Sequence, residues 1–116
     1  MDHGAYYFAG LAVECALKAC IARHTRTRSF FPTPQTVRAC YSHDLPKLLQ
    51  TAGLEVELER DSAIEPAIGV NWSVVSGWNC GADSRYNVSV DLKPLAFYAA
   101  VTAKPHGVIA WIEQYW

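Results

Sequence analysis

The side chains best suited to chemistry in this chain are a carboxylate, an amine, an imidazole and a guanidinium, at Glu14, Lys18, His43 and Arg85. A histidine can move a proton near neutral pH, and a guanidinium can hold a phosphate through two parallel hydrogen bonds. Together with Tyr86, the three cationic or protonatable groups would line a polar cleft that accepts a phosphate or a base. These residue types favour the binding or cleavage of a phosphate-containing ligand.

A purely structural role for the same side chains stays open. Glu14 and Lys18 are four residues apart, so on a helix they can satisfy one another, with Arg85 as a third partner. His43 would then be an exposed residue at the start of a helix, and Tyr86 would be a core aromatic.

The element that must position the first two of these residues is an apolar stretch over residues 5–22, AYYFAGLAVECALKACIA. Gly10, Glu14 and Lys18 fall at i, i+4 and i+8, so they form one narrow polar stripe on a helix whose other sides are apolar. Such a helix must be buried nearly all round. Because a bundle of 116 residues exposes much of its surface, we expect a second copy of the chain to supply part of this cover, in a homodimer.

Two connections flank the expected second helix. Residues 25–41 contain two prolines and no sustained hydrophobic period, which indicates a long connection with one short helical turn at most. The helix itself begins at Ser42 or Asp44, either of which can cap it, and Gly53 suits the position just past its end. Residues 54–61 alternate apolar and charged side chains but have no partner strand, so we expect an extended linker.

The C-terminal half is expected to add further helices. One opens with the capping box Ser62-x-x-Glu65 and runs to Trp78. After a polar link, Asp91 caps a last helix that is kinked or broken at Pro105, because proline removes a backbone donor. The sequence thus predicts an all-α fold, an up-and-down helical bundle of four to five helices.

Composition places residues 1–116 in one globular domain, because 51% of the residues are hydrophobic, 18% are charged and the net charge is −1. Glu14 and Lys18 interrupt the apolar N-terminal stretch, and no basic leader precedes it. Neither a signal peptide nor contact with a membrane is therefore expected, and we predict a cytoplasmic protein.

The small net charge hides a segregation along the chain. A basic cluster at the expected end of the first helix comprises Arg23, His24, Arg26 and Arg28, and an acidic one lies within residues 55–65. The basic cluster suits either stabilisation of a helix C-terminus or contact with phosphates.

The chain has four cysteines, at Cys15, Cys20, Cys40 and Cys80, and no two of them form a CxxC motif. We expect free thiols that fill the core of a protein in a reducing compartment. The pairs Cys20-x3-His24 and Cys40-x2-His43 could supply four zinc ligands, but a loop would have to bring them together. No metal and no other cofactor are therefore expected.

Three short motifs follow one another: Glu14-x-x-Leu17-Lys18, then His43-Asp44-Leu45, then Trp78 followed by Arg85-Tyr86. In this order they resemble the HEPN family of small all-α domains, over roughly residues 5–115. The resemblance implies a helical bundle that commonly dimerises, found in prokaryotic toxin–antitoxin pairs, in defence systems and as a partner of minimal nucleotidyltransferases. It implies ligand contacts by the motif residues Glu14, Lys18, His43, Asp44, Arg85 and Tyr86.

Many members of this family are metal-independent ribonucleases that pair an arginine with a histidine a few residues later. Counting from Arg85, the corresponding positions hold Val90, Asp91 and Leu92, so the expected acid–base group is missing. We therefore expect a non-catalytic module that binds RNA or a nucleotide, or docks a partner such as a co-encoded nucleotidyltransferase. One alternative is a ribonuclease that uses Arg85 with His43 or Asp91, and another is a structural subunit that only dimerises.

Overall fold

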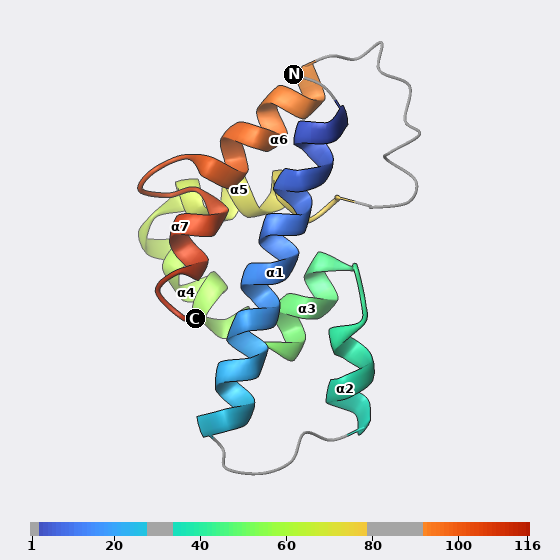
Figure 1. Ribbon diagram of the computed structural model, residues 1–116. Helices are drawn as coiled ribbons and strands as arrows, with labels where there is room; N and C mark the ends of the chain where they lie inside the picture. Colours follow the sequence, from blue (N-terminus) through green and yellow to red (C-terminus); the bar gives the residue numbers. More distant parts are fainter. Residues whose placement is uncertain (1–2, 28–33, 79–91) are drawn as a thin grey trace.

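The computed structural model describes residues 3–27, 34–78 and 92–116, and every regular element in these ranges is an α-helix (Figure 1). The all-α prediction is confirmed. Seven helices within the described ranges replace the expected four to five, because two segments expected to be connections are helical. The helices are α1 (His3–Thr27), α2 (Pro34–Cys40), α3 (Leu45–Thr51), α4 (Glu55–Ile64), α5 (Pro66–Val75), α6 (Leu92–Thr102) and α7 (Val108–Ile112).

Helix α1 is the centre of the bundle. It runs through the middle of Figure 1, with α6 and α7 on one side and α3 on the other, and it contacts all three. Val13 and Leu17 on α1 are fully buried, as are Trp111 and Ile112 on α7. Glu14 is also buried, and Lys18, one helical turn after it, is partly exposed, so the core helix places this pair at the edge of its buried side.

The single chain does not bury α1 all round, so the cover that a second copy was expected to supply stays a prediction. Exposed positions recur along one face of α1, at Phe8, Ala12, Cys15, Ala19 and Ala22. Phe8 is the large side chain among them and is 66% exposed. The other four are small, so covering them offers a neighbouring helix little apolar area to bury. The expectation of core-filling cysteines is accordingly confirmed for buried Cys20 and wrong for Cys15.

Over Gly4–His24, α1 is also long and apolar enough to cross a membrane, and half of its most apolar window is buried inside this fold. The central helix of a soluble bundle meets the same criteria of length and composition. The location of the protein therefore stays a prediction.

Helix α3 begins as predicted at Asp44, whose Oδ1 accepts a hydrogen bond from the backbone N–H of Lys47 at 3.2 Å. Leu45 and Leu48 are fully buried and fix α3 against α1. Gly53 follows with φ of 75°, a left-handed conformation in which a side chain would be strained. The cap and the buried leucines together fix where the residues just before α3 lie.

The extended linker expected over residues 54–61 is wrong, because this segment forms most of α4. Leu54 is buried and Leu58 packs against the core, while Val56 is exposed. Leu54 and Leu58 are one helical turn apart, so the helical period accounts for the buried side, and the alternation of apolar and charged residues is incidental.

The capping box Ser62-x-x-Glu65 is also wrong, because Ser62 lies inside α4. Glu65 has an extended backbone, with φ of −132° and ψ of 92°, and separates α4 from α5. Pro66 explains the break, since the residue before a proline avoids helical angles while proline itself suits the first turn of a helix.

The predicted break at Pro105 is confirmed, since α6 ends at Thr102 and α7 begins at Val108. The N–H of Gly107 donates to the carbonyl oxygen of Ala103 at 2.8 Å, and a Cβ on Gly107 would lie 2.3 Å from that oxygen. Glycine thus permits the tight return that brings α7 onto α1. The capping role expected for Asp91 lies outside the described residues.

Candidate functional site

A carboxylate–amine–imidazole cluster lies between α1 and the start of α3. Its centre is Glu14, which is 4% exposed and is the only charged or polar residue buried within the described ranges. Lys18 Nζ donates to Glu14 Oε2 at 2.7 Å, and His43 Nδ1 lies 2.9 Å from Glu14 Oε1. Three residues predicted from the sequence to share a site therefore do meet, and we call them the Glu14 cluster.

Local structure explains how His43 reaches Glu14. The backbone N–H of Asp44 donates to the hydroxyl oxygen of Ser42 at 2.9 Å, and Asp44 in turn caps α3 through Lys47. These two bonds order the turn on either side of His43. Asp44 therefore has a capping role, and the ligand contact predicted for its exposed carboxylate stays a prediction.

The proton arrangement at His43 follows from the chemistry of its partner. An ionised carboxylate only accepts hydrogen bonds, so Nδ1 of His43 carries the proton that it donates to Glu14. The His43 side chain is 59% exposed, and its other ring nitrogen is left for solvent or a ligand. The cluster thus presents an oriented imidazole beside an ammonium group.

Glu14 stays ionised at neutral pH although it is buried. Burial by itself raises the pKa of the carboxyl group, but the hydrogen bonds and charges of Lys18 and His43 outweigh it. The net effect lowers the pKa of Glu14 below its ordinary value of 4.5. A buried anion therefore fixes two cationic or protonatable groups at the surface.

The wider charge distribution supports an anionic ligand on this side of the molecule. Helices α2 and α3 present the exposed cations Arg38 and Lys47, whereas α4 carries three exposed or partly exposed glutamates, at 55, 57 and 59. Arg23, at the far end of α1, donates to the backbone oxygen of Trp116 at 2.6 Å. Part of the predicted basic cluster therefore ties α1 to the C-terminal residue.

Other predicted site residues are not placed beside the Glu14 cluster. Arg85, Tyr86 and Asp91 lie outside the described residues. Trp78 is buried, and its ring packs directly on Gly10 of the polar stripe. Among the described residues, its indole N–H has no hydrogen-bond partner.

A second polar network, which the sequence reasoning missed, joins α4 to α7. Asp61 Oδ2 accepts hydrogen bonds from the hydroxyl of Tyr115 at 2.6 Å and from Nε1 of Trp111 at 2.8 Å. These bonds, from Tyr115 first and then Trp111, lower the pKa of Asp61, and burial together with Asp61 raises that of Tyr115. Because Trp111 is fully buried and donates its indole N–H to Asp61, this network fastens two helices together. No local motif signals it, since Asp61 is 50 residues from Trp111.

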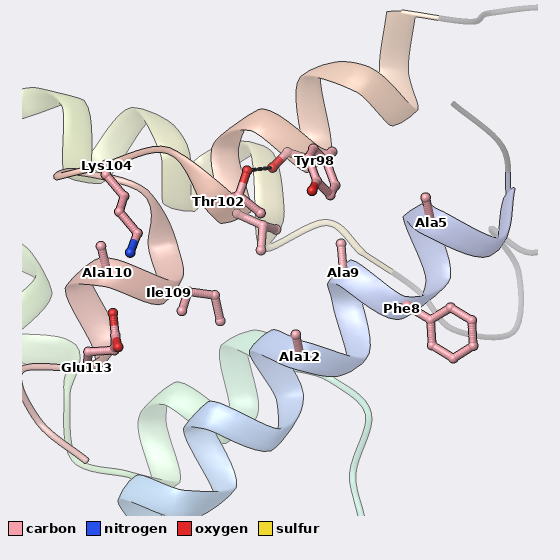
Figure 2. A pocket seen from close by; sticks show the side chains of 11 residues that line it. Ala5, Phe8, Ala9, Ala12, Tyr98, Thr102, Lys104, Ile109, Ala110 and Glu113 are labelled. Atoms are coloured by element: carbon pink, nitrogen blue, oxygen red, sulfur yellow. Dashed lines mark hydrogen bonds between the residues drawn. The ribbon is translucent and has the colours of Figure 1, made fainter.

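An apolar groove of about 450 Å³ lies on the other side of α1, between α1, α6 and α7 (Figure 2). Ala5, Ala9 and Ala12 form its wall on α1, and Phe8 projects at one end. Lys104 and Glu113 stand at the opposite end. None of the predicted site residues that the structure describes lines this groove.

No group of three His, Cys, Asp or Glu side chains within the described ranges is placed to hold a metal ion. The zinc site considered above, with Cys20, His24, Cys40 and His43 as ligands, therefore has no support in the described residues. His43 is turned toward Glu14 instead.

No protein-family model, curated protein or solved structure matches this chain. The resemblance to HEPN domains thus rests on the three motifs and on their order.

Proposed function

We propose that this protein is a non-catalytic, HEPN-like module that binds RNA or a nucleotide through phosphate contacts at Lys18 and His43. One observation carries the proposal: buried Glu14 holds both groups, at 2.7 and 2.9 Å, while His43 remains largely exposed. Residues of the first two HEPN-like motifs thus meet at one carboxylate. The motif residues farther along the chain, Arg85 and Tyr86, are part of the proposal on the resemblance alone.

The chemistry of the Glu14 cluster suits an anionic ligand. An ammonium group carries three N–H donors and Glu14 engages one, so Lys18 retains donors for phosphate oxygens. Since Glu14 already fixes the amine, less side-chain freedom is lost when a ligand binds.

The direct test is RNA binding measured by fluorescence anisotropy over a range of salt concentrations. We expect Lys18→Gln to weaken binding and to reduce the slope of log affinity against log salt by about 0.7, the value for one phosphate contact on a single strand. Lys104→Gln, which removes an exposed cation on the groove side of α1, is the matched control and should change neither quantity. Equal losses in the two variants, or no binding by the unaltered protein, would refute the proposal.

A ribonuclease is the second candidate, and the Glu14–His43 contact favours it. A histidine oriented by a carboxylate through Nδ1 is the arrangement that general bases use in hydrolytic sites. Metal-free incubation with labelled RNA, using His43→Asn and Arg85→Ala, decides the question. Cleavage that both variants retain would exclude this candidate, and cleavage that either abolishes would replace the non-catalytic proposal.

The homodimer, the co-encoded nucleotidyltransferase-like partner and the cytoplasmic location belong to the same proposal. A soluble dimer measured by sedimentation would support it. Variants of the Glu14 cluster that remain folded but less stable, and that bind RNA as the unaltered protein does, would favour the purely structural subunit instead.

A further inference from the structure

Tyr41 is the most exposed large hydrophobic residue within the described ranges, at 78%. It follows α2 directly, and its backbone N–H donates to the carbonyl oxygen of Arg38 at 3.1 Å. Within those ranges its side chain makes no hydrogen bond and no ring contact. The fold therefore uses the backbone of Tyr41 to end α2 but leaves the phenol ring unused.

Two side chains that can contact phosphate lie close to Tyr41 in sequence. Arg38 lies one helical turn before it and is exposed, and His43 of the Glu14 cluster lies two residues after it. The nearest acidic residue in sequence is Asp44, whose carboxylate is held as the cap of α3. An exposed aromatic ring set among groups that attract phosphate is the combination that single-stranded nucleic-acid sites use, because every base offers a flat face for stacking.

We infer that Tyr41 is a stacking platform for an unpaired base, and that the ligand of the Glu14 cluster is single-stranded RNA. The inference rests on the proposed function and names its substrate class. In a duplex the bases are stacked on one another and their faces are closed, so a stacking tyrosine selects against paired RNA. Phosphate contacts at Lys18 and His43 position the strand, and Tyr41 holds one base.

The test is a double-mutant cycle in which the Tyr41 ring and the RNA base are removed separately and together. Fluorescence anisotropy measures the affinity for a short single-stranded RNA and for the same strand with abasic sites, using the full chain. Tyr41→Ala should weaken binding of the intact strand between about five-fold and about 150-fold, without changing the salt slope. On the abasic strand the same variant should bind as the unaltered protein does. Tyr41→Phe, which keeps the ring, should bind normally.

Tyr98→Ala is the matched control, since Tyr98 is an exposed tyrosine on α6 that lines the apolar groove. Equal affinity of Tyr41→Ala and the unaltered protein, or an equal loss on intact and abasic strands, would overturn the inference. If Lys18→Gln still loses affinity, the proposed function survives that result. No RNA binding by the unaltered protein would overturn both.

Discussion

The two opposite sides of helix α1 differ in how other parts of the chain cover them. Glu14 and Ala5 are nine residues apart, which is two and a half helical turns, so they point in opposite directions. On the Glu14 side, an acid that is costly to bury is satisfied by Lys18 and His43. On the Ala5 side, small side chains and a projecting Phe8 leave a groove of about 450 Å³ between α1, α6 and α7.

The comparison shows what closes the surface of a core helix. The side that carries the polar stripe is closed, because α3 supplies leucines, the turn before α3 supplies His43, and Trp78 lies on Gly10. The apolar side is open, because alanines leave more room than α6 and α7 fill. A hydrophobic pattern indicates that a helix surface prefers burial. Whether neighbouring helices can pack against that surface depends on the volume of the side chains on it.

We expect the largest loss of stability when a side chain is added on the side of α1 that Trp78 covers. A Cβ on Gly10 would lie 1.9 Å from the indole ring of buried Trp78, so Gly10→Leu forces the helix and the ring apart. We expect a loss of about 3 kcal/mol in the free energy of unfolding, measured by urea denaturation. Leucine favours a helix more than glycine does, by about 0.8 kcal/mol, so helix propensity alone predicts stabilisation. The expected destabilisation therefore comes from the steric clash with Trp78.

The matched control for that substitution is Gly77→Ala, because a Cβ at Gly77 meets no atom within 4 Å. A nearly unchanged stability is expected there. If Gly10→Leu proved as stable as this control, the close contact between Trp78 and Gly10 would be contradicted.

Removing the buried acid should have the next largest effect. Glu14→Ala takes away the common partner of Lys18 and His43 and leaves a small cavity beside Leu17. Because both partners can turn to solvent, we expect a loss of about 2 kcal/mol, less than for a fully buried ion pair. Glu113→Ala, at an exposed acid of the groove, should cost less than about 0.5 kcal/mol and serves as the control. Equal losses in the two variants would mean that the Glu14 cluster adds nothing to stability.

Acid should lower the stability of the fold, in part through the Glu14 side. The folded-state pKa of Glu14 lies below its ordinary value of 4.5, so the stabilisation is complete above that value and is lost as the pH falls through the folded pKa. Asp61 acts in the same direction and adds to the loss. Urea midpoints measured from pH 7 downward should fall in this acid range, and Glu14→Gln should show a shallower fall. An identical pH profile in that variant would contradict the assignment.

The smallest effect on the monomer, and a direct test of the open side, is expected for Phe8→Ser. Since Phe8 is 66% exposed, the free energy of unfolding should change by less than about 0.5 kcal/mol. If a second copy covers this face, as the sequence predicts for the homodimer, the same change should weaken self-association in sedimentation experiments. Unaltered association, or a monomeric parent protein, would mean that the groove stays open in solution.

Local rules predicted several parts of the site and fold correctly. Asp44 caps α3, the chain breaks around Pro105, and Glu14 bonds Lys18 one helical turn away. Each of these depends on residues within about one turn of one another, where side-chain and backbone chemistry alone fixes the geometry. The error over residues 54–61 has the same origin, because a short alternating pattern fits a strand and a helix equally until its neighbours are known.

The all-α class, the central place of α1 and the polar pair on it could all be predicted from the order of the residues. Helix packing was needed to show that His43, 29 residues away, contacts the second oxygen of Glu14, and that Asp61 binds Trp111 and Tyr115. Packing also leaves one face of α1 exposed in the single chain. The physical reason is that backbone hydrogen bonding and proline or capping chemistry act over a few residues, whereas contacts between distant residues depend on how whole helices fill the space between them.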